Sequence, residues 1–189
     1  MRKGERTRRA MIGAAVDLMQ RKGIAATGMR EVVETAQAPR GSIAFHFPGG
    51  KEQLAVEAIG AAAAGFERII AQIFAESRTP AAAVERFAEL MAAGLEASHF
   101  ERGCPLATTA LETAAVSDAL AAACDAGFGA WQAPVRDALL RAGCKPAAAR
   151  DRALLVISAL EGALLIARAR HDASPVRTVA RQLRPLLEA

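Results

Sequence analysis

The sequence predicts an all-α protein of about nine helices. The chain is rich in alanine and 52% hydrophobic but only 4% aromatic, a composition that favours helices over sheets. Apolar residues recur three and four positions apart along most of the chain, and prolines and glycines occur where such runs begin and end. At 189 residues the chain is long enough to bury a substantial core.

A basic amphipathic helix is expected first, over residues 5–21. Val16 and Met19 belong to its apolar stripe, and Arg6 is one of three arginines in its first turn. Positive charges at the positive end of a helix favour a bound anion. The Arg-Lys-Gly run at residues 21–23 is typical of a helix end.

Two short helices separated by a tight turn follow. Apolar spacing over residues 29–33 predicts the first of them, with Thr27 or Gly28 as its N-cap. Pro39 suits only a first helical turn, so residues 36–38 form the tight turn and a second helix begins near Pro39. Helix, turn and helix together are typical of DNA-reading proteins.

The second short helix has two different faces. Ile43 and Phe47 lie four apart and are expected to face inward. The opposite face suits a major groove, where arginine can bond guanine and small or apolar groups can contact a thymine methyl. An ordinary helical hairpin within a core is the alternative. The side chains expected outside or at the rim are Arg40, Ser42, Ala44, Phe45 and His46.

A long helix of about seven turns is expected over residues 51–76, after the Pro48-Gly49-Gly50 break. The helix dipole disfavours Lys51 at this end unless an anion binds, so Lys51 and the free amides predict a phosphate clamp. A solvated surface lysine is the alternative. The helix joins an expected DNA-binding domain (residues 1–50) to an expected ligand-binding and dimerisation domain (residues 51–189). A stiff helix would convert a displacement at its ligand-binding end into a tilt of the DNA-binding domain. A plain scaffold helix is the alternative.

Five further helices are expected, at residues 80–99, 106–115, 118–142, 146–170 and from 175 onward. Between them we expect a largely apolar cavity for a small molecule. Trp131 and Glu112 are the strongest candidates in it, because a large ring and a carboxylate among apolar neighbours both require a partner. Ordinary core packing is the alternative for every residue of the set. The expected lining is drawn from Phe87, Met91, Leu95, Leu106, Thr109, Glu112, Phe128 and Trp131.

The last two helices are apolar over more of their circumference than one packing face needs. In residues 146–170 the apolar positions cover more than one side of the helix, and Gly162 allows close approach. These positions are Leu154, Ile157, Leu160, Leu164 and Leu165. Two such helices from each of two chains would form a four-helix bundle. We therefore predict a homodimer, with an intrachain core as the alternative.

Charge is unevenly distributed along the chain, whose net charge is +4. Residues 1–51 hold ten Lys or Arg against four Asp or Glu, whereas the remainder holds fourteen against sixteen. Such a basic segment indicates phosphate binding, although basic arms also occur on proteins that bind RNA or membranes. The absence of a long apolar run or a signal-like segment predicts a cytoplasmic protein without a membrane partner.

The run APRGSIAFHFPGGKEQL resembles the TetR/AcrR family of dimeric transcriptional regulators, in particular its LmrA/YxaF-type branch. The GCPLATTALE and FGAW segments resemble the same branch. The resemblance implies that residues 39–45, including Gly41, form the recognition helix, and that Thr27, His46 and Lys51 meet the DNA backbone. Ala44 stands where the family usually has a tyrosine, so one expected phosphate contact is missing.

Cys104, Cys124 and Cys144 are spaced twenty apart without a CxxC pair, which suits neither a zinc site nor a disulfide scaffold. Reduced thiols are expected, with no metal and no cofactor, and a redox sensor at Cys104 is the alternative. An enzyme with Cys104 as nucleophile and His99 as base is weakly supported, because no third group orients the pair. No catalytic residue is therefore assigned.

These observations predict a homodimeric transcriptional regulator, a repressor that binds a pseudo-palindromic operator. One short helix reads only a few base pairs, so specificity requires a second copy. A small apolar or amphipathic effector would release the operator by shifting the conformational population. An architectural DNA-binding protein without ligand control is the alternative.

Overall fold

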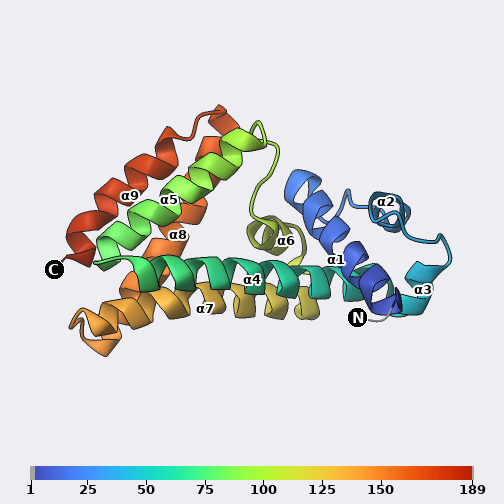
Figure 1. Ribbon diagram of the computed structural model, residues 1–189, viewed down its shortest axis with the longest axis horizontal. Helices are drawn as coiled ribbons and strands as arrows, with labels where there is room; N and C mark the ends of the chain where they lie inside the picture. Colours follow the sequence, from blue (N-terminus) through green and yellow to red (C-terminus); the bar gives the residue numbers. More distant parts are fainter. Residues whose placement is uncertain (1–2, 189) are drawn as a thin grey trace. The chain divides into compact units, whose positions relative to one another are not determined.

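The computed structural model describes residues 3–188 and confirms the all-α prediction (Figure 1). Every regular element in this range is a helix, and nine of them are described. They are α1 (Lys3–Lys22), α2 (Met29–Thr35), α3 (Ser42–His46), α4 (Gly50–Glu76), α5 (Pro80–Ala97), α6 (Pro105–Thr113), α7 (Asp118–Arg141), α8 (Pro146–Arg170) and α9 (Ser174–Leu187).

Prolines begin several of these helices, as the sequence predicts. Pro80 and Pro146 occupy the first helical position of α5 and α8, where the missing N–H costs no hydrogen bond. The Thr79 hydroxyl caps α5 by accepting a hydrogen bond from the Ala82 N–H at 3.2 Å. At the other end of α8, His171 adopts a left-handed conformation with φ of 52°, which ends the helix.

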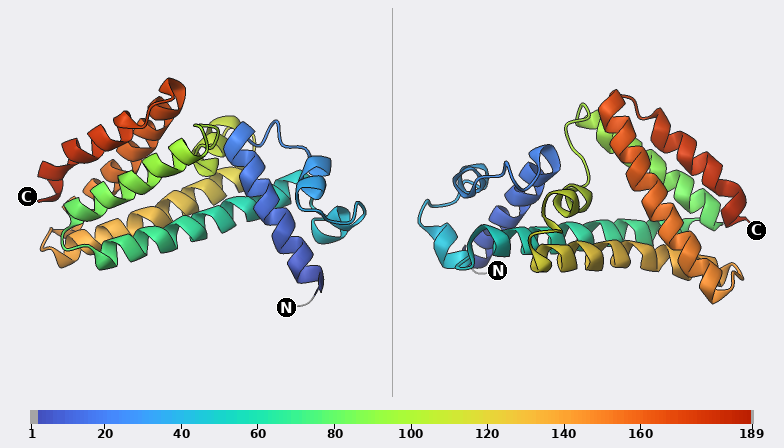
Figure 2. Two further views of the ribbon diagram at one scale, coloured as in Figure 1. Left: turned by 45° about the horizontal axis from the view of Figure 1, so that its top comes forward. Right: turned by 180° about the vertical axis from the view of Figure 1, so that it is seen from behind.

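Two compact units make up the described chain. The first contains residues 3–63 and 105–127, and within it α1 packs against α2 and α6. The second contains residues 64–104 and 128–188, and within it α9 lies beside α5 and α8 (Figures 1 and 2). Helices α4 and α7 contribute turns to both units. A functional boundary at residue 50 remains a prediction.

The core of the first unit holds the helix-turn-helix segment in place. Phe47, the residue after α3, is fully buried, as predicted. The Arg8 guanidinium lies 5.1 Å from the centre of its ring and forms a 2.5 Å ion pair with Glu57 of α4. Arg8 therefore joins α1, α3 and α4, and its charge is already balanced within the unit.

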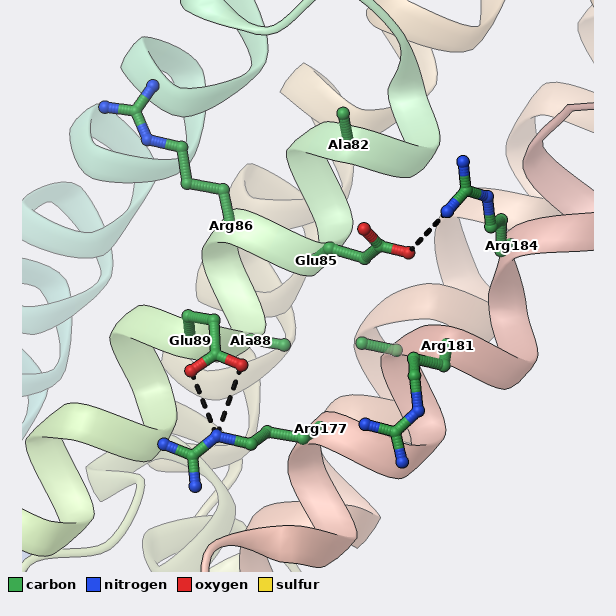
Figure 3. Close-up of a pocket in the computed structure, with 9 residues that line it drawn as sticks. Ala82, Glu85, Arg86, Ala88, Glu89, Arg177, Arg181 and Arg184 are labelled. Atoms are coloured by element: carbon green, nitrogen blue, oxygen red, sulfur yellow. Dashed lines mark hydrogen bonds and ion pairs between the residues drawn. The ribbon is translucent and has the colours of Figure 1, made fainter.

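In the second unit, a charged groove of about 590 Å³ lies between α5 and α9 (Figure 3). Arg177 pairs with Glu89 and Glu96, and Arg184 pairs with Glu85. These ion pairs connect α9 to α5 on the surface. Four arginines and two glutamates line the groove, and Arg181 has no carboxylate partner within residues 3–188. None of the predicted effector residues lines it.

Apolar side chains also remain exposed on the second unit. Leu154 and Leu165 of α8 are 53% and 62% exposed. Leu155, Ile166 and, on α9, Leu186 are exposed as well. No helix within residues 3–188 is both long and apolar enough to cross a lipid bilayer.

Candidate nucleic-acid interface

The second helix of the helix-turn-helix begins later than its proline suggested. Gly28, not Thr27, is the N-cap of α2, and α3 starts at Ser42 and not near Pro39. The Pro39 carbonyl accepts hydrogen bonds from the Ser42 N–H at 2.9 Å and the Ser42 hydroxyl at 2.6 Å. Residues 39–41 therefore form a turn, because this carbonyl bonds three residues ahead and not four. Arg40 and Gly41 precede the helix that they were expected to join.

The outward face of this segment carries the predicted side chains. Phe45 is 81% exposed, and Arg40, Gly41 and Ala44 are exposed beside it in sequence. Ser42 and His46 are half-buried, and the His46 ring meets the Phe45 ring edge-on at 5.1 Å. On the opposite side Ile43 is half-buried next to the fully buried Phe47. The predicted division into two faces is therefore present.

Positive charge in the first unit is partly neutralised. Lys22 forms a 2.5 Å ion pair with Glu31, and this hydrogen bond holds the pKa of the Glu31 carboxyl below its usual range. Arg6 and Arg40, in contrast, are exposed and form no ion pair within residues 3–188. These two guanidinium groups are available for a bound anion.

Two of the residues expected to contact the DNA backbone are Thr27 and Lys51. In the structure, both form hydrogen bonds with the α1–α2 turn, residues 23–27. Thr27 is only 5% exposed, and its hydroxyl donates to the Gly23 carbonyl at 2.6 Å. The Lys51 ammonium donates to the Ala25 carbonyl at 3.1 Å. Both side chains thus hold the turn, and their phosphate contacts remain predictions.

Among the predicted effector residues of the second unit, Phe128 and Trp131 meet each other. The Trp131 ring is buried, perpendicular to Phe128 at 5.6 Å and tilted to Phe66 at 5.5 Å. Phe66, in α4, was not among the predicted lining residues. On α5, Phe87 and Leu95 are buried and Met91 is half-buried.

The predicted effector residues of α6 belong to the first unit and divide into two kinds. Leu106 and Thr109 are buried, and the Thr109 Oγ1 atom has no hydrogen-bond partner within residues 3–188. Glu112 is exposed, and its Oε2 atom accepts a hydrogen bond from the Ala25 N–H at 2.9 Å. Glu112 therefore has a partner in the α1–α2 turn, and its place in an effector site remains a prediction.

Sequence reasoning missed a buried acid beside Cys104. The Oε2 atom of Glu161, in α8, is buried and finds no hydrogen-bond partner in the described residues. Burial raises the pKa of the Glu161 carboxyl to about 7, and a hydrogen bond with Cys104 opposes this rise. Within residues 3–188, no three His, Cys, Asp or Glu side chains gather as a metal site requires.

Comparison with known proteins identifies the family. Residues 11–58 match the bacterial regulatory proteins of the tetR family, and residues 80–182 match the C-terminal domain of LmrA/YxaF-like transcriptional regulators. The protein belongs to the TetR family. It is therefore a DNA-binding transcriptional regulator with a C-terminal ligand-binding domain.

Relatives and solved structures match almost the whole length of this TetR-family chain. The transcriptional regulator LmrA of Bacillus subtilis is 28% identical over 96% of this chain and 97% of its own. The regulator Rv0196 of Mycobacterium tuberculosis is 32% identical over 96% of this chain and 94% of its own. A crystal structure of the regulatory protein TetR from Rhodobacter sphaeroides shares the fold, with a TM-score of 0.84 and 23% identity over 94% of this chain and 97% of its own.

The matched ranges contain both groups of predicted residues. The reading segment, residues 39–46, lies within the tetR-family match, and residues 87–131 lie within the LmrA/YxaF-like match. TetR-family proteins bind operator DNA and typically form homodimers. The resemblance inferred from APRGSIAFHFPGGKEQL and GCPLATTALE is thereby confirmed.

Proposed function

We propose that this TetR-family regulator is a homodimeric repressor that a small apolar or amphipathic effector releases from a pseudo-palindromic operator. The observation that carries the proposal is the exposed face around Arg40, Ala44 and Phe45, which has an unpaired guanidinium and a bare aromatic ring. Water solvates such a ring poorly, whereas a major groove offers it thymine methyl groups. A regulator that acts on chromosomal DNA works in the cytoplasm.

Each residue of the interface has a proposed role. Arg40 reads guanine through its two parallel N–H donors, and Ala44 and Phe45 contact apolar base edges. Arg6 and His46 contact phosphates, and so does Lys51, whose ammonium has two N–H groups left after its bond to Ala25. Gly41 and Ser42 allow close approach of the backbone. Thr27 acts indirectly, through the turn that it holds.

Homodimerisation through α8 and α9 is supported by the apolar side chains that these helices expose. Leu154 and Leu165 on α8, with Leu186 on α9, lose contact with water if a second copy covers them. Burial of apolar surface is worth roughly 25 cal/mol per Å². A four-helix bundle from two copies has a two-fold axis, which matches the symmetry of a pseudo-palindrome.

Effector control is supported by the polar atom that α6 leaves unsatisfied. A buried hydroxyl normally has a hydrogen-bond partner, and Thr109 Oγ1 has none within the described chain. A polar group on an otherwise apolar effector would satisfy it. An effector that binds the released form about a hundredfold more tightly shifts the equilibrium by roughly 2.7 kcal/mol.

The base-reading and phosphate-binding roles are distinguishable by two substitutions. Arg40→Ala should weaken binding to the operator by about tenfold to a hundredfold and leave binding to random DNA almost unchanged, because it removes a base contact. Lys51→Ala should weaken binding to both DNAs and lower the salt slope by about one unit. Fluorescence anisotropy at several salt concentrations, with DNA from directly upstream of the coding sequence, measures both effects.

Arg181→Ala is the matched control for this experiment. It removes one exposed positive charge from α9, where the guanidinium bonds only the Thr178 hydroxyl within residues 3–188. It should therefore change neither affinity nor salt slope. If Arg40→Ala and Lys51→Ala weakened both DNAs equally, the assignment of a base reader and a phosphate ligand would be wrong.

A further inference from the structure

Both backbone polar groups of Ala25, at the centre of the α1–α2 turn, are bonded by side chains from other helices. The N–H donates to the Glu112 carboxylate of α6 at 2.9 Å, and the carbonyl accepts from the Lys51 ammonium of α4 at 3.1 Å. Ala25 itself is exposed, so water was available to both groups. The two side chains instead hold the turn from opposite sides of one residue.

Gly23 shows how closely Glu112 approaches this turn. Gly23 has φ of +78°, and a Cβ atom added there would lie 1.9 Å from the Glu112 Oε1 atom. Any other L-residue at position 23 would be strained in its backbone and would also displace the carboxylate. The turn and the end of α6 are therefore fitted to each other, although Ala25 and Glu112 are separated by 87 positions in sequence.

Local helix energetics do not explain the carboxylate at this position. Glu112 lies in the last turn of α6 and meets the end of α1, and the dipoles of both helices disfavour negative charge at their C-terminal ends. Its hydrogen bond to the Ala25 N–H offsets this cost. Glu112 is thus unfavourable for its own helix but forms a specific hydrogen bond with a distant turn. Residues that break a local preference in this way are expected at functional sites.

The α1–α2 turn leads directly into α2, which precedes the reading segment. A change in the direction of the turn therefore changes where Arg40 and Phe45 point.

We propose that Glu112 and Lys51 are positioning residues that fix the α1–α2 turn through Ala25 and thereby set the direction of the reading helices. The consequence for DNA reading rests on the proposed function. Loss of the Glu112 carboxylate frees the Ala25 N–H and loosens the turn.

Amide hydrogen exchange in the free protein tests the contact without DNA or effector. Glu112→Ala should speed exchange of the Ala25 N–H by about tenfold or more, because a hydrogen bond to a charged acceptor is lost. Glu112→Gln retains a side-chain oxygen acceptor and should recover most of the protection. Asp125→Ala, which removes another exposed carboxylate from the first unit, should leave exchange at Ala25 unchanged. Unchanged exchange in Glu112→Ala would overturn the proposal.

Operator binding tests whether the contact positions the reading helices. Glu112→Ala should weaken binding to the upstream DNA by about tenfold, with little change for random DNA, and Glu112→Gln should restore it. Wild-type affinity in Glu112→Ala, or equal loss in the alanine and glutamine variants, would overturn the positioning role. If the wild-type protein showed no preference for upstream DNA, the proposed function would fail, whereas the exchange result would still decide the contact.

A double-mutant cycle guards against effects of general unfolding. Gly23→Ala should lower the melting temperature through both backbone strain and collision with Glu112. In the Glu112→Ala background only the strain remains, so the loss should be smaller. Equal losses in the two backgrounds would show that the carboxylate does not lie against Gly23, and would count against the proposal.

Discussion

Leu165→Glu should convert the regulator from a dimer to a monomer and weaken operator binding by at least about a hundredfold. The Leu165 side chain is 62% exposed on α8, within the apolar face assigned to the second copy. A carboxylate there would be buried without a partner in the four-helix bundle, and the two-fold axis would place two of them in one interface. In a dimer, binding of one DNA-binding domain raises the effective concentration of the other at the second half-site, and a monomer loses this gain.

Sedimentation and fluorescence anisotropy measure the two parts of this result, and circular dichroism verifies the fold. Leu111→Glu is the matched control, because Leu111 is an 80% exposed leucine on α6, outside the proposed dimer helices. It should remain dimeric and bind operator normally. A Leu165→Glu protein that stayed dimeric, or a monomer that bound operator with wild-type affinity, would contradict the proposed assembly.

Glu161→Gln should remove much of the pH dependence of stability above pH 5. Burial raises the pKa of the Glu161 carboxyl from 4.5 to about 7, so the folded state favours the protonated form. The resulting cost is absent below pH 4.5, grows as the pH rises to about 7 and is constant above it. The shift corresponds to about 3 kcal/mol at pH 8 and under about 1 kcal/mol at pH 5.

Urea unfolding at pH 5, 6, 7 and 8 measures this slope. The glutamine side chain does not titrate, so the stability of the variant relative to the wild type should rise by about 2 kcal/mol between pH 5 and pH 8. Comparing slopes removes any constant cost of a buried amide. Cys104→Ala should have the opposite effect, because it removes the hydrogen bond that opposes the rise in the Glu161 pKa. Parallel pH profiles for Glu161→Gln and the wild type would refute the buried-acid assignment.

Much of the reading segment could be predicted because its determinants are local. The four-residue spacing of Ile43 and Phe47 was enough to separate a buried side from an exposed one. Prolines located the beginnings of α5 and α8 for the same reason, since a ring without an N–H fits a helix only at its start. The start of α3 was wrong by about one turn, because the Pro39 carbonyl had a competing bond from Ser42.

The roles of charged residues were harder to predict. Glu112 was assigned to a cavity because its neighbours in sequence are apolar, but its partner is the Ala25 N–H. Arg8 belongs to a run of arginines that suggested phosphate binding, yet it pairs with Glu57 and covers Phe47. A charged side chain is long and can meet any element that folding brings near, so its partner cannot be derived from spacing along one helix.

The sequence alone predicts an all-helical chain with a basic, DNA-reading N-terminal segment, because helix periodicity and local charge depend on residues that are close together in the chain. Folding was required to bring Glu112 and Lys51 to Ala25, to bury Glu161 beside Cys104, and to leave Leu154 and Leu165 uncovered. Each of these depends on residues far apart in the chain. Burial and long-range hydrogen bonding are properties of packed helices, and no single helix carries the information that determines them.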